Sequence, residues 1–209
     1  MFAVLLCASI LAVACGDDDD RPAPDGTLTD AAASSTPTDT ITGIEAVDRV
    51  LLVVERADPI AFEALLRPSS IPCNNELGSG GPPHCFNAPG RPPEGTPISV
   101  FPYDVCEREW QFDLTPFTTR MLERLGELYA VVRIEQFTQP ATPEALPDGG
   151  YAILYTDAND FQAHALVMTT SGIIAANTIC DAGSTAEWFL DEGPPFRGPE
   201  VILQGPAFE

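Results

Sequence analysis

The chain has 209 residues, which is enough for one ordinary domain with additional segments. It carries 31 acidic residues against 10 basic ones, all arginine, and its formal net charge is -21. This charge excludes nucleic acid and anionic membrane surfaces as charge-driven partners, because such binding needs Lys and Arg to neutralise phosphates. A surplus of carboxylates is ordinary for solubility, and it leaves cationic partners open.

Residues 1–14 form an uncharged apolar run, MFAVLLCASILAVA, that ends in small residues and is followed by Cys15 and four aspartates. The run is shorter than the roughly 20 residues that span a bilayer. Its length is typical of the apolar part of a secretory signal. Two alternatives stay open, a secreted protein with a free Cys15 and an uncleaved membrane helix.

The segment LAVAC resembles the lipobox of bacterial lipoproteins, in which a small residue precedes a cysteine that becomes the acylated N-terminus. Ala14 and Val13 match that pattern, whereas Ala12 stands where leucine is usual. The resemblance implies that the signal is removed and that Cys15 carries the lipid. It therefore implies a location in the cell envelope, outside the cytoplasm, with the protein anchored through its lipid to a bacterial membrane.

The residues after Cys15 are mostly Asp, Ala, Ser, Thr and Pro. Such a composition buries too little apolar surface to offset the entropy of ordering, so it predicts a disordered tether. We therefore expect a signal peptide at 1–14, a lipidated cysteine and disordered acidic tether at 15–40, and a single disulfide-stabilised α+β domain with a Pro-rich C-terminal tail at 41–209.

Cys73, Cys85, Cys106 and Cys180 remain once the signal, with its Cys7, is removed. An even number of cysteines in an exported protein indicates disulfides. Three pairings exist, and Cys73 with Cys85 is the local choice because the segment between them is rich in turn-forming residues. Cys106 would then pair with Cys180. A zinc site made of all four is the alternative, although the sequence has no C-x-x-C pair.

Three helices are predicted, and the first two form a hairpin. Thr42 and Glu45 have the spacing of a capping box, and the apolar residues that follow recur at helical intervals, which predicts a helix of about 14 residues. Asp58 and Pro59 then begin a second helix that ends before Pro68. Thr115 and Pro116 begin the third.

Five short runs rich in β-branched and aromatic residues predict strands, at 98–106, 128–137, 150–158, 162–170 and 172–180. The last two are separated by Ser171 and Gly172 and read as a β-hairpin. The tail predicts one helical turn after Ser184 and a short strand from Val201 to Leu203. The fold class expected is α+β, with a helical hairpin and a third helix packed on one face of one curved antiparallel sheet of about four to five strands.

The order of these elements, and ADPIAFEALL in particular, resembles the nuclear-transport-factor-like α+β superfamily over residues 42–180. The resemblance implies helices and a curved sheet that enclose a conical pocket. Members of that superfamily include small isomerases, dehydratases and noncatalytic binding domains, so the fold leaves function open. The long cysteine-containing insert departs from the pattern and is similar to that of uncharacterised bacterial lipoproteins.

No nucleophile, phosphate-binding or metal motif occurs in the sequence, so no catalytic residue, metal or cofactor is predicted. Aromatic and polar residues on predicted strand faces are candidates for the rim of a ligand pocket, the alternative being half-buried sheet residues. Tyr151 and Tyr155 share one strand face, and Tyr129 is expected to share another with Arg133. His164 alternates with Gln162 and Leu166. An acidic partner would orient His164 as a general base, the candidates being Asp113, Glu135, Asp157 and Asp160.

Three functions follow as hypotheses. The first is a noncatalytic, lipid-anchored domain that binds an unidentified ligand or envelope protein. The second is a small pocket-bearing enzyme of the isomerase or dehydratase type that uses His164 with a carboxylate. The third is an interaction module in the envelope whose acidic surface meets a cationic partner.

Overall fold

The computed structural model describes residues 41–76, 81–105, 107–137, 150–158, 162–178, 186–191 and 196–205. The chain divides into two units, Met1–Thr38 and Asp39–Glu209, and every described residue belongs to the second. The expected signal, Cys15 and the tether lie outside the described residues, as do Cys106 and Cys180. Within the described ranges, no helix combines the length and the apolar character needed to cross a membrane.

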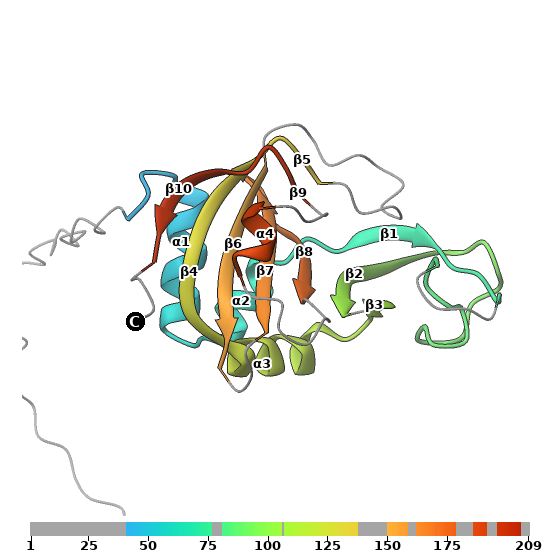
Figure 1. Ribbon diagram of the computed structural model, residues 1–209. Coiled ribbons are helices and arrows are strands. Elements are labelled where there is room, and N and C mark those ends of the chain that lie inside the picture. The colour runs from blue at the N-terminus through green and yellow to red at the C-terminus, as the bar shows by residue number, and fades with distance from the viewer. Residues whose placement is uncertain are drawn as a thin grey trace, which may run out of the picture. The chain divides into compact units, whose positions relative to one another are not determined.

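The centre of the fold is an eight-stranded mixed sheet in the order β1-β2-β8-β7-β6-β4-β10, with β3 paired to β2 (Figure 1). Its strands are β1 (Ser69–Pro72), β2 (Pro97–Val105), β3 (Glu107–Gln111), β4 (Leu125–Ile134), β6 (Gly150–Asp157), β7 (Ala163–Thr169), β8 (Gly172–Thr178) and β10 (Glu200–Gln204). A separate pair is formed by β5 (Gln136–Phe137) and β9 (Phe196–Arg197).

The expectation of one antiparallel sheet of four to five strands is therefore wrong, although the α+β class holds. Strand β1 lies in a Pro-rich segment, and β3 has the charged sequence EREWQ, so neither carries the apolar alternation of a strand. Both are strands because β2 supplies their hydrogen-bonding partner. The sheet is mixed because β2 runs parallel to β8, a pairing between distant segments that local sequence patterns do not reveal.

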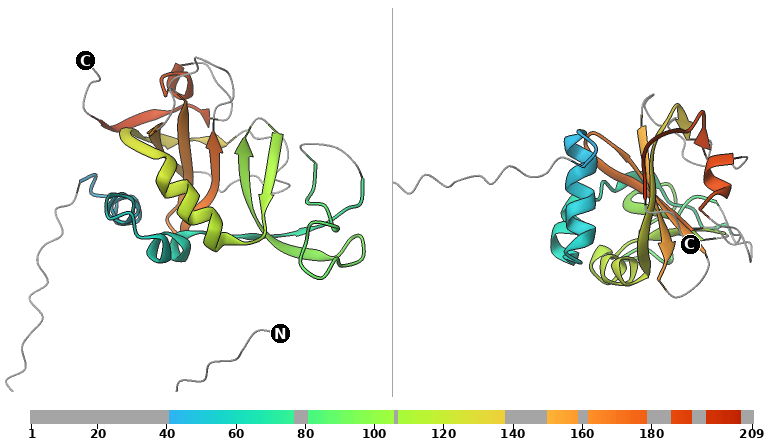
Figure 2. Two further views of the ribbon diagram at one scale, coloured as in Figure 1. Left: turned by 90° about the horizontal axis from the view of Figure 1, so that it is seen from below. Right: turned by 60° about the vertical axis from the view of Figure 1, so that its left-hand side comes forward.

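Helices lie against both faces of the sheet, which corrects the expectation that one face only is covered. The helices α1 (Glu45–Glu55), α2 (Pro59–Leu65) and α3 (Leu114–Arg124) pack on one face, and the short α4 (Trp188–Asp191) lies over the other (Figure 2). The helical turn expected after Ser184 is present as α4, but its position over the second face was not predicted, because so short an element shows no periodicity that marks a buried side.

Side-chain capping explains where α2 begins but not where α1 begins. The carboxylate of Asp58 accepts hydrogen bonds from the backbone N–H groups of Ile60 and Ala61, so α2 begins as predicted. At α1 the N-cap residue is Ile44, which has no side-chain cap, so the predicted capping box is not formed. The hydroxyl of Thr42 instead donates to Asp48 over 2.6 Å.

Two apolar clusters match these two layers. The first joins residues of the three long helices to one face of the sheet, with Phe62, Phe101, Phe117, Met121 and Ile153 among its members. The second is rich in alanine and packs the opposite face against Phe189 and Phe196. Strands β6, β7 and β8 are buried on both faces, which explains their nearly continuous apolar sequences.

The predicted hairpin of β7 and β8 is present and contacts the end of α2. Gly172 begins β8 with a φ of +141°, and a Cβ at this position would collide with the carbonyl oxygen of Leu65. The N–H of Arg67 donates to the carbonyl of Ile173 over 2.7 Å. A glycine is therefore required where the helical layer meets the turn.

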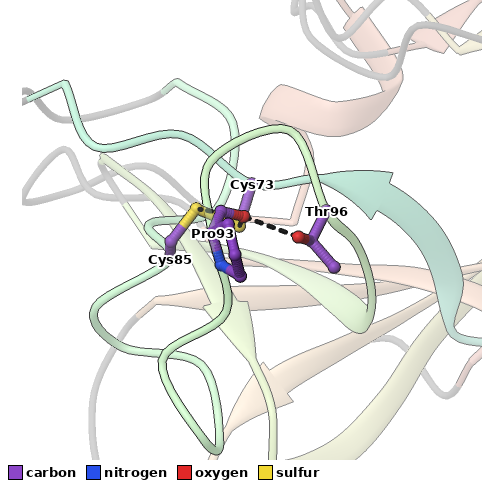
Figure 3. The surroundings of a disulfide bond; sticks show 4 residues. All are labelled: Cys73, Cys85, Pro93 and Thr96. Carbon is purple, nitrogen blue, oxygen red and sulfur yellow. Dashed lines mark hydrogen bonds between the residues drawn. A yellow bond between two sulfur atoms is a disulfide. The ribbon is translucent and has the colours of Figure 1, made fainter.

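Cys73 and Cys85 form the disulfide that their local spacing predicted (Figure 3). Around it, the N–H of Cys73 donates to the carbonyl of Thr96 over 3.0 Å, and the hydroxyl of Thr96 donates to the carbonyl of Pro93 over 2.6 Å. These contacts connect the described part of the cysteine-containing insert to the beginning of β2.

Candidate functional site

Four strand positions and one helix end bring a set of polar side chains together on the helical face of the sheet. Tyr155 of β6 lies opposite His164 of β7, which lies opposite Thr178 of β8. Directly opposite residues of paired strands point to the same face, so His164 and Thr178 are neighbours there. Tyr103 of β2 and Arg124 at the end of α3 complete the group.

Four of these side chains, all except that of Tyr155, form a closed ring of hydrogen bonds with Asp157 at the end of β6. Arg124 donates from Nε and Nη2 to Oδ2 of Asp157 over 3.1 and 2.9 Å, and from Nη1 to the hydroxyl of Tyr103 over 3.4 Å. The Tyr103 hydroxyl lies 3.2 Å from Oγ1 of Thr178, which lies 2.7 Å from Nδ1 of His164. Nε2 of His164 lies 2.8 Å from Oδ2 of Asp157 and closes the ring.

The direction of each hydrogen bond follows from its chemistry. The carboxylate of Asp157 can only accept, so Nε2 of His164 carries a proton, and in the neutral imidazole Nδ1 is then the acceptor. Thr178 therefore donates to Nδ1 and accepts from Tyr103, whose hydroxyl accepts from Arg124. This order is consistent around the ring and requires a neutral imidazole.

Burial also keeps His164 neutral. Its side chain is 0% exposed, and that of Asp157 is 1% exposed. Desolvation lowers the pKa of His164 below its ordinary value, and the charge of Arg124 lowers it further, while the hydrogen bond and the negative charge of Asp157 oppose the shift. The net direction is downward, because burial has the largest effect.

A hollow of about 250 Å³ opens beside the ring. Its lining comes from β2, β3 and α3 and consists of Tyr103, Glu109, Gln111, Phe117, Arg120, Met121 and Arg124. Tyr103 and Arg124 belong to both the ring and the hollow, whereas His164 does not line it. The ring thus lies behind one wall of the hollow and holds two of its polar groups in place.

The lining of the hollow combines an apolar part with charges of both signs. Phe117 and Met121 are buried residues of α3. Arg120 lies one helical turn before Arg124 and makes no hydrogen bond or ion pair with any residue that the structure describes. Glu109 and Gln111 come from β3, and their side chains approach each other only to 3.5 Å.

The structure brings two of the five candidate pocket residues together. Tyr155 and His164 lie opposite each other on the face of the sheet that the helices cover, and both are buried. The hydroxyl of Tyr155 has no hydrogen-bond partner among the described residues. Burial raises the pKa of this phenol, so Tyr155 stays neutral. Neither residue lines the hollow.

The other three candidates lie elsewhere on the sheet. Arg133 is opposite Tyr151 and forms an exposed ion pair with Glu200, with 2.9 Å between Nη1 and Oε2. A β-bulge between Leu128 and Ala130 places Tyr129 against the alanine-rich cluster, on the face opposite to Arg133. The expectation that Tyr129 and Arg133 share a face therefore fails, because the extra residue of the bulge inverts the alternation.

Sequence reasoning included Asp157 among four possible partners of His164 but missed Tyr103, Thr178 and Arg124. One signal for Arg124 was present, since it is a basic residue in the last turn of a predicted helix. Tyr103 and Thr178 required the parallel pairing of β2 with β8, which sequence patterns do not show. Among the described residues, no cluster of three or more His, Cys, Asp or Glu is arranged to hold a metal ion.

Comparison of the chain with family models, with curated proteins and with solved structures found no match.

Proposed function

We propose that the folded unit is a noncatalytic binding domain and that the hollow beside α3 takes a small ligand. We propose further that a lipidated tether holds this domain outside the cytoplasmic membrane of a bacterium. The observation that carries the binding function is the hollow itself, in which the ring of hydrogen bonds fixes Arg124 and Arg120 has no polar partner among the described residues.

An arginine whose side chain is already fixed binds a ligand more tightly than a mobile arginine does, because it loses less conformational entropy on binding. The Nε and Nη2 atoms of Arg124 bond to Asp157 and Nη1 bonds to Tyr103, so the side chain has little rotamer freedom left to lose. Phe117 and Met121 provide apolar surface against which a ligand loses contact with water. A preformed site with an apolar part and few polar groups is the usual form of a small-molecule pocket.

The position of His164 favours binding over acid–base catalysis. A general base must come within hydrogen-bonding distance of the proton that it removes. Both ring nitrogens of His164 are occupied by Asp157 and Thr178, and the side chain is fully buried. The hollow that the described residues form is lined by Tyr103 and Arg124 and not by His164.

The anchoring part of the proposal has separate support, namely the resemblance of LAVAC to a lipobox and the acidic, apolar-poor sequence that follows it. A disulfide between Cys73 and Cys85 agrees with an oxidising compartment outside the cytoplasm.

The binding function is tested by closing the hollow. A library of small metabolites is screened by ligand-observed NMR against the wild-type domain, a Gln111→Trp variant and a Gln204→Trp variant. Gln111 lines the hollow, whereas Gln204 is an exposed residue of β10, so the second variant is a matched control. We expect compounds that bind the wild type and Gln204→Trp but not Gln111→Trp.

Two outcomes contradict the proposal. Compounds that bind all three proteins equally would show that the hollow is not the site, and a screen without any binder would remove the binding function. Mass spectrometry of the same mixtures before and after incubation tests the noncatalytic part. Consumption of a compound by the wild type and not by Gln111→Trp would show an enzyme.

A further inference from the structure

From the charges that line the hollow we infer its ligand class, an inference that rests on the proposed binding function. We propose that the hollow selects a small zwitterion, with its anionic group at Arg120 and Arg124, its ammonium group at Glu109, and an apolar body against Phe117 and Met121. A free amino acid with an apolar side chain is the simplest molecule of this class.

The walls of the hollow carry opposite charges that do not neutralise each other. Arg120 projects from α3 and Glu109 from β3, and the two form no ion pair. Two opposite charges in one pocket that do not meet leave room for a molecule that satisfies both. Such a molecule would form charge-assisted hydrogen bonds with both side chains, and these are among the stronger polar contacts.

The count of charges disfavours a simple anion. The charge of Arg124 is already balanced by the buried carboxylate of Asp157. This leaves Arg120 and Glu109 as one charge of each sign that meets no opposite charge among the described residues. An anion would gain Arg120 but would lie close to Glu109. The net charge of -21 also repels anions at a distance, whereas a zwitterion has no net charge to repel.

A simple cation is disfavoured for the complementary reason. It would gain Glu109 but would face the positive guanidinium group of Arg120 on α3. A molecule that carries both charges avoids each of these repulsions. The arrangement therefore discriminates against molecules with either charge alone, partly through repulsion.

The size and the apolar part of the hollow restrict the ligand further. Its volume of about 250 Å³ lies just below the range of about 300 to 1,000 Å³ that is usual for drug-sized ligands. The ring of Phe117 packs edge-on to that of Tyr103 at a centroid distance of 5.3 Å, which gives the hollow an aromatic side. A compact molecule with one apolar group fits these dimensions.

The test uses four probes with the folded unit in isothermal titration calorimetry. L-Phenylalanine and 6-aminohexanoate are zwitterions with a short and a long charge separation. 3-Phenylpropionate lacks the ammonium group of phenylalanine, and phenethylamine lacks its carboxylate. We expect at least one of the two zwitterions to bind. Where phenylalanine binds, its affinity should be at least about tenfold higher than that of 3-phenylpropionate or of phenethylamine.

Charge-removing variants assign the two ends of the ligand. Arg120→Gln and Glu109→Gln should each lower the affinity for the zwitterion by about tenfold or more. The exposed residues Arg56 and Glu55 at the end of α1 provide matched controls, since Arg56→Gln and Glu55→Gln make the same charge changes away from the hollow. These controls should bind as the wild type does.

The inference is overturned if neither zwitterion binds, if 3-phenylpropionate or phenethylamine binds as tightly as phenylalanine, or if Glu109→Gln leaves zwitterion affinity unchanged. These outcomes are distinct from failure of the binding function. If a ligand of another class binds the wild type but not Gln111→Trp, the hollow is still a binding site, and only the assignment of a zwitterionic ligand is refuted.

Discussion

His164 of β7 and Asp157 at the end of β6 form a buried hydrogen bond, with 2.8 Å between Nε2 and Oδ2. The same carboxylate oxygen accepts two hydrogen bonds from Arg124, so one buried atom links the sheet to the end of α3. This arrangement combines a histidine that is neutral with an arginine that is fixed. In the function that we propose, the buried dyad supports the geometry of the hollow rather than a reaction at the imidazole.

Removal of the carboxylate tests whether the ring supports the fold. Asp157→Ala leaves Arg124 and Nε2 of His164 without their acceptor and should reduce the free energy of unfolding by about 3 kcal/mol. Glu200→Ala removes the partner of Arg133 in an exposed ion pair and should cost less than about 1 kcal/mol. Urea unfolding of both variants measures the difference, and equal losses would contradict a structural role for the ring.

The neutral state of His164 predicts a dependence of stability on pH. The pKa of His164 is lowered in the folded state from the ordinary value of 6.5, so below that pH the unfolded chain binds a proton that the folded chain does not. Stability should be fully present above pH 6.5 and should fall as the pH decreases from there toward the lowered pKa, by at most about 1.4 kcal/mol per pH unit.

Unfolding titrations between pH 7.5 and about 5, above the range in which ordinary carboxyl groups titrate, isolate this contribution. The chain has only two histidines, so His84→Gln is the matched control. The slope should persist in His84→Gln and disappear in His164→Gln. A slope that persists in His164→Gln would assign the dependence to other groups.

Local sequence patterns predicted the elements whose residues repeat regularly. Asp58 and Pro59 marked the start of α2, and Ser171 and Gly172 marked the turn of the β7–β8 hairpin, because capping and turn chemistry act within a few residues. Strands β1 and β3 were missed since they depend on pairing with β2 rather than on their own sequence. The size and the mixed character of the sheet follow from such pairings, and so does the error in the number and direction of the expected strands.

The site was predictable only in part, for the same reason. His164 was selected because it shares one face of a predicted strand with Gln162 and Leu166, and Asp157 was one of several carboxylates available to it. The connection to Tyr103 depends on the parallel register that aligns Tyr103 with Ala176. Tyr129 was misplaced because a bulge cannot be seen in an alternating sequence.

The ring should behave as one unit rather than as independent contacts. Thr178→Val leaves Nδ1 of His164 without a donor, and Tyr103→Phe removes the hydroxyl that bonds to both Thr178 and Arg124. Each change should cost about 1 to 3 kcal/mol. The double variant should lose less than the sum by about 0.5 kcal/mol or more, because the two side chains share a hydrogen bond. Additive losses in denaturant unfolding would argue against coupling.

A second disulfide, between Cys106 and Cys180, stays a prediction. In the parallel register of β2 and β8, Val105 aligns with Thr178. In the sequence, Cys106 directly follows Val105, and Cys180 is the second residue after Thr178. Peptide mapping without reduction should recover Cys73 joined to Cys85 and Cys106 joined to Cys180. Free thiols at Cys106 and Cys180, with the first disulfide intact, would refute the second pair alone.

Lipidation of Cys15 is tested by the mass of the whole protein. Residues 1–14 carry no positive charge, so the chain is expressed in a bacterial host behind a short lysine-containing leader. If LAVAC acts as a lipobox, intact mass spectrometry should show loss of the leader and of residues 1–14, together with the addition of a diacylglycerol group. A Cys15→Ser variant should lack that addition and leave the membrane fraction, because a single sulfur carries the lipid. A mass that retains residues 1–14, or an unmodified Cys15 after cleavage, would remove the anchor from the proposed function and leave the binding domain to be judged on its hollow.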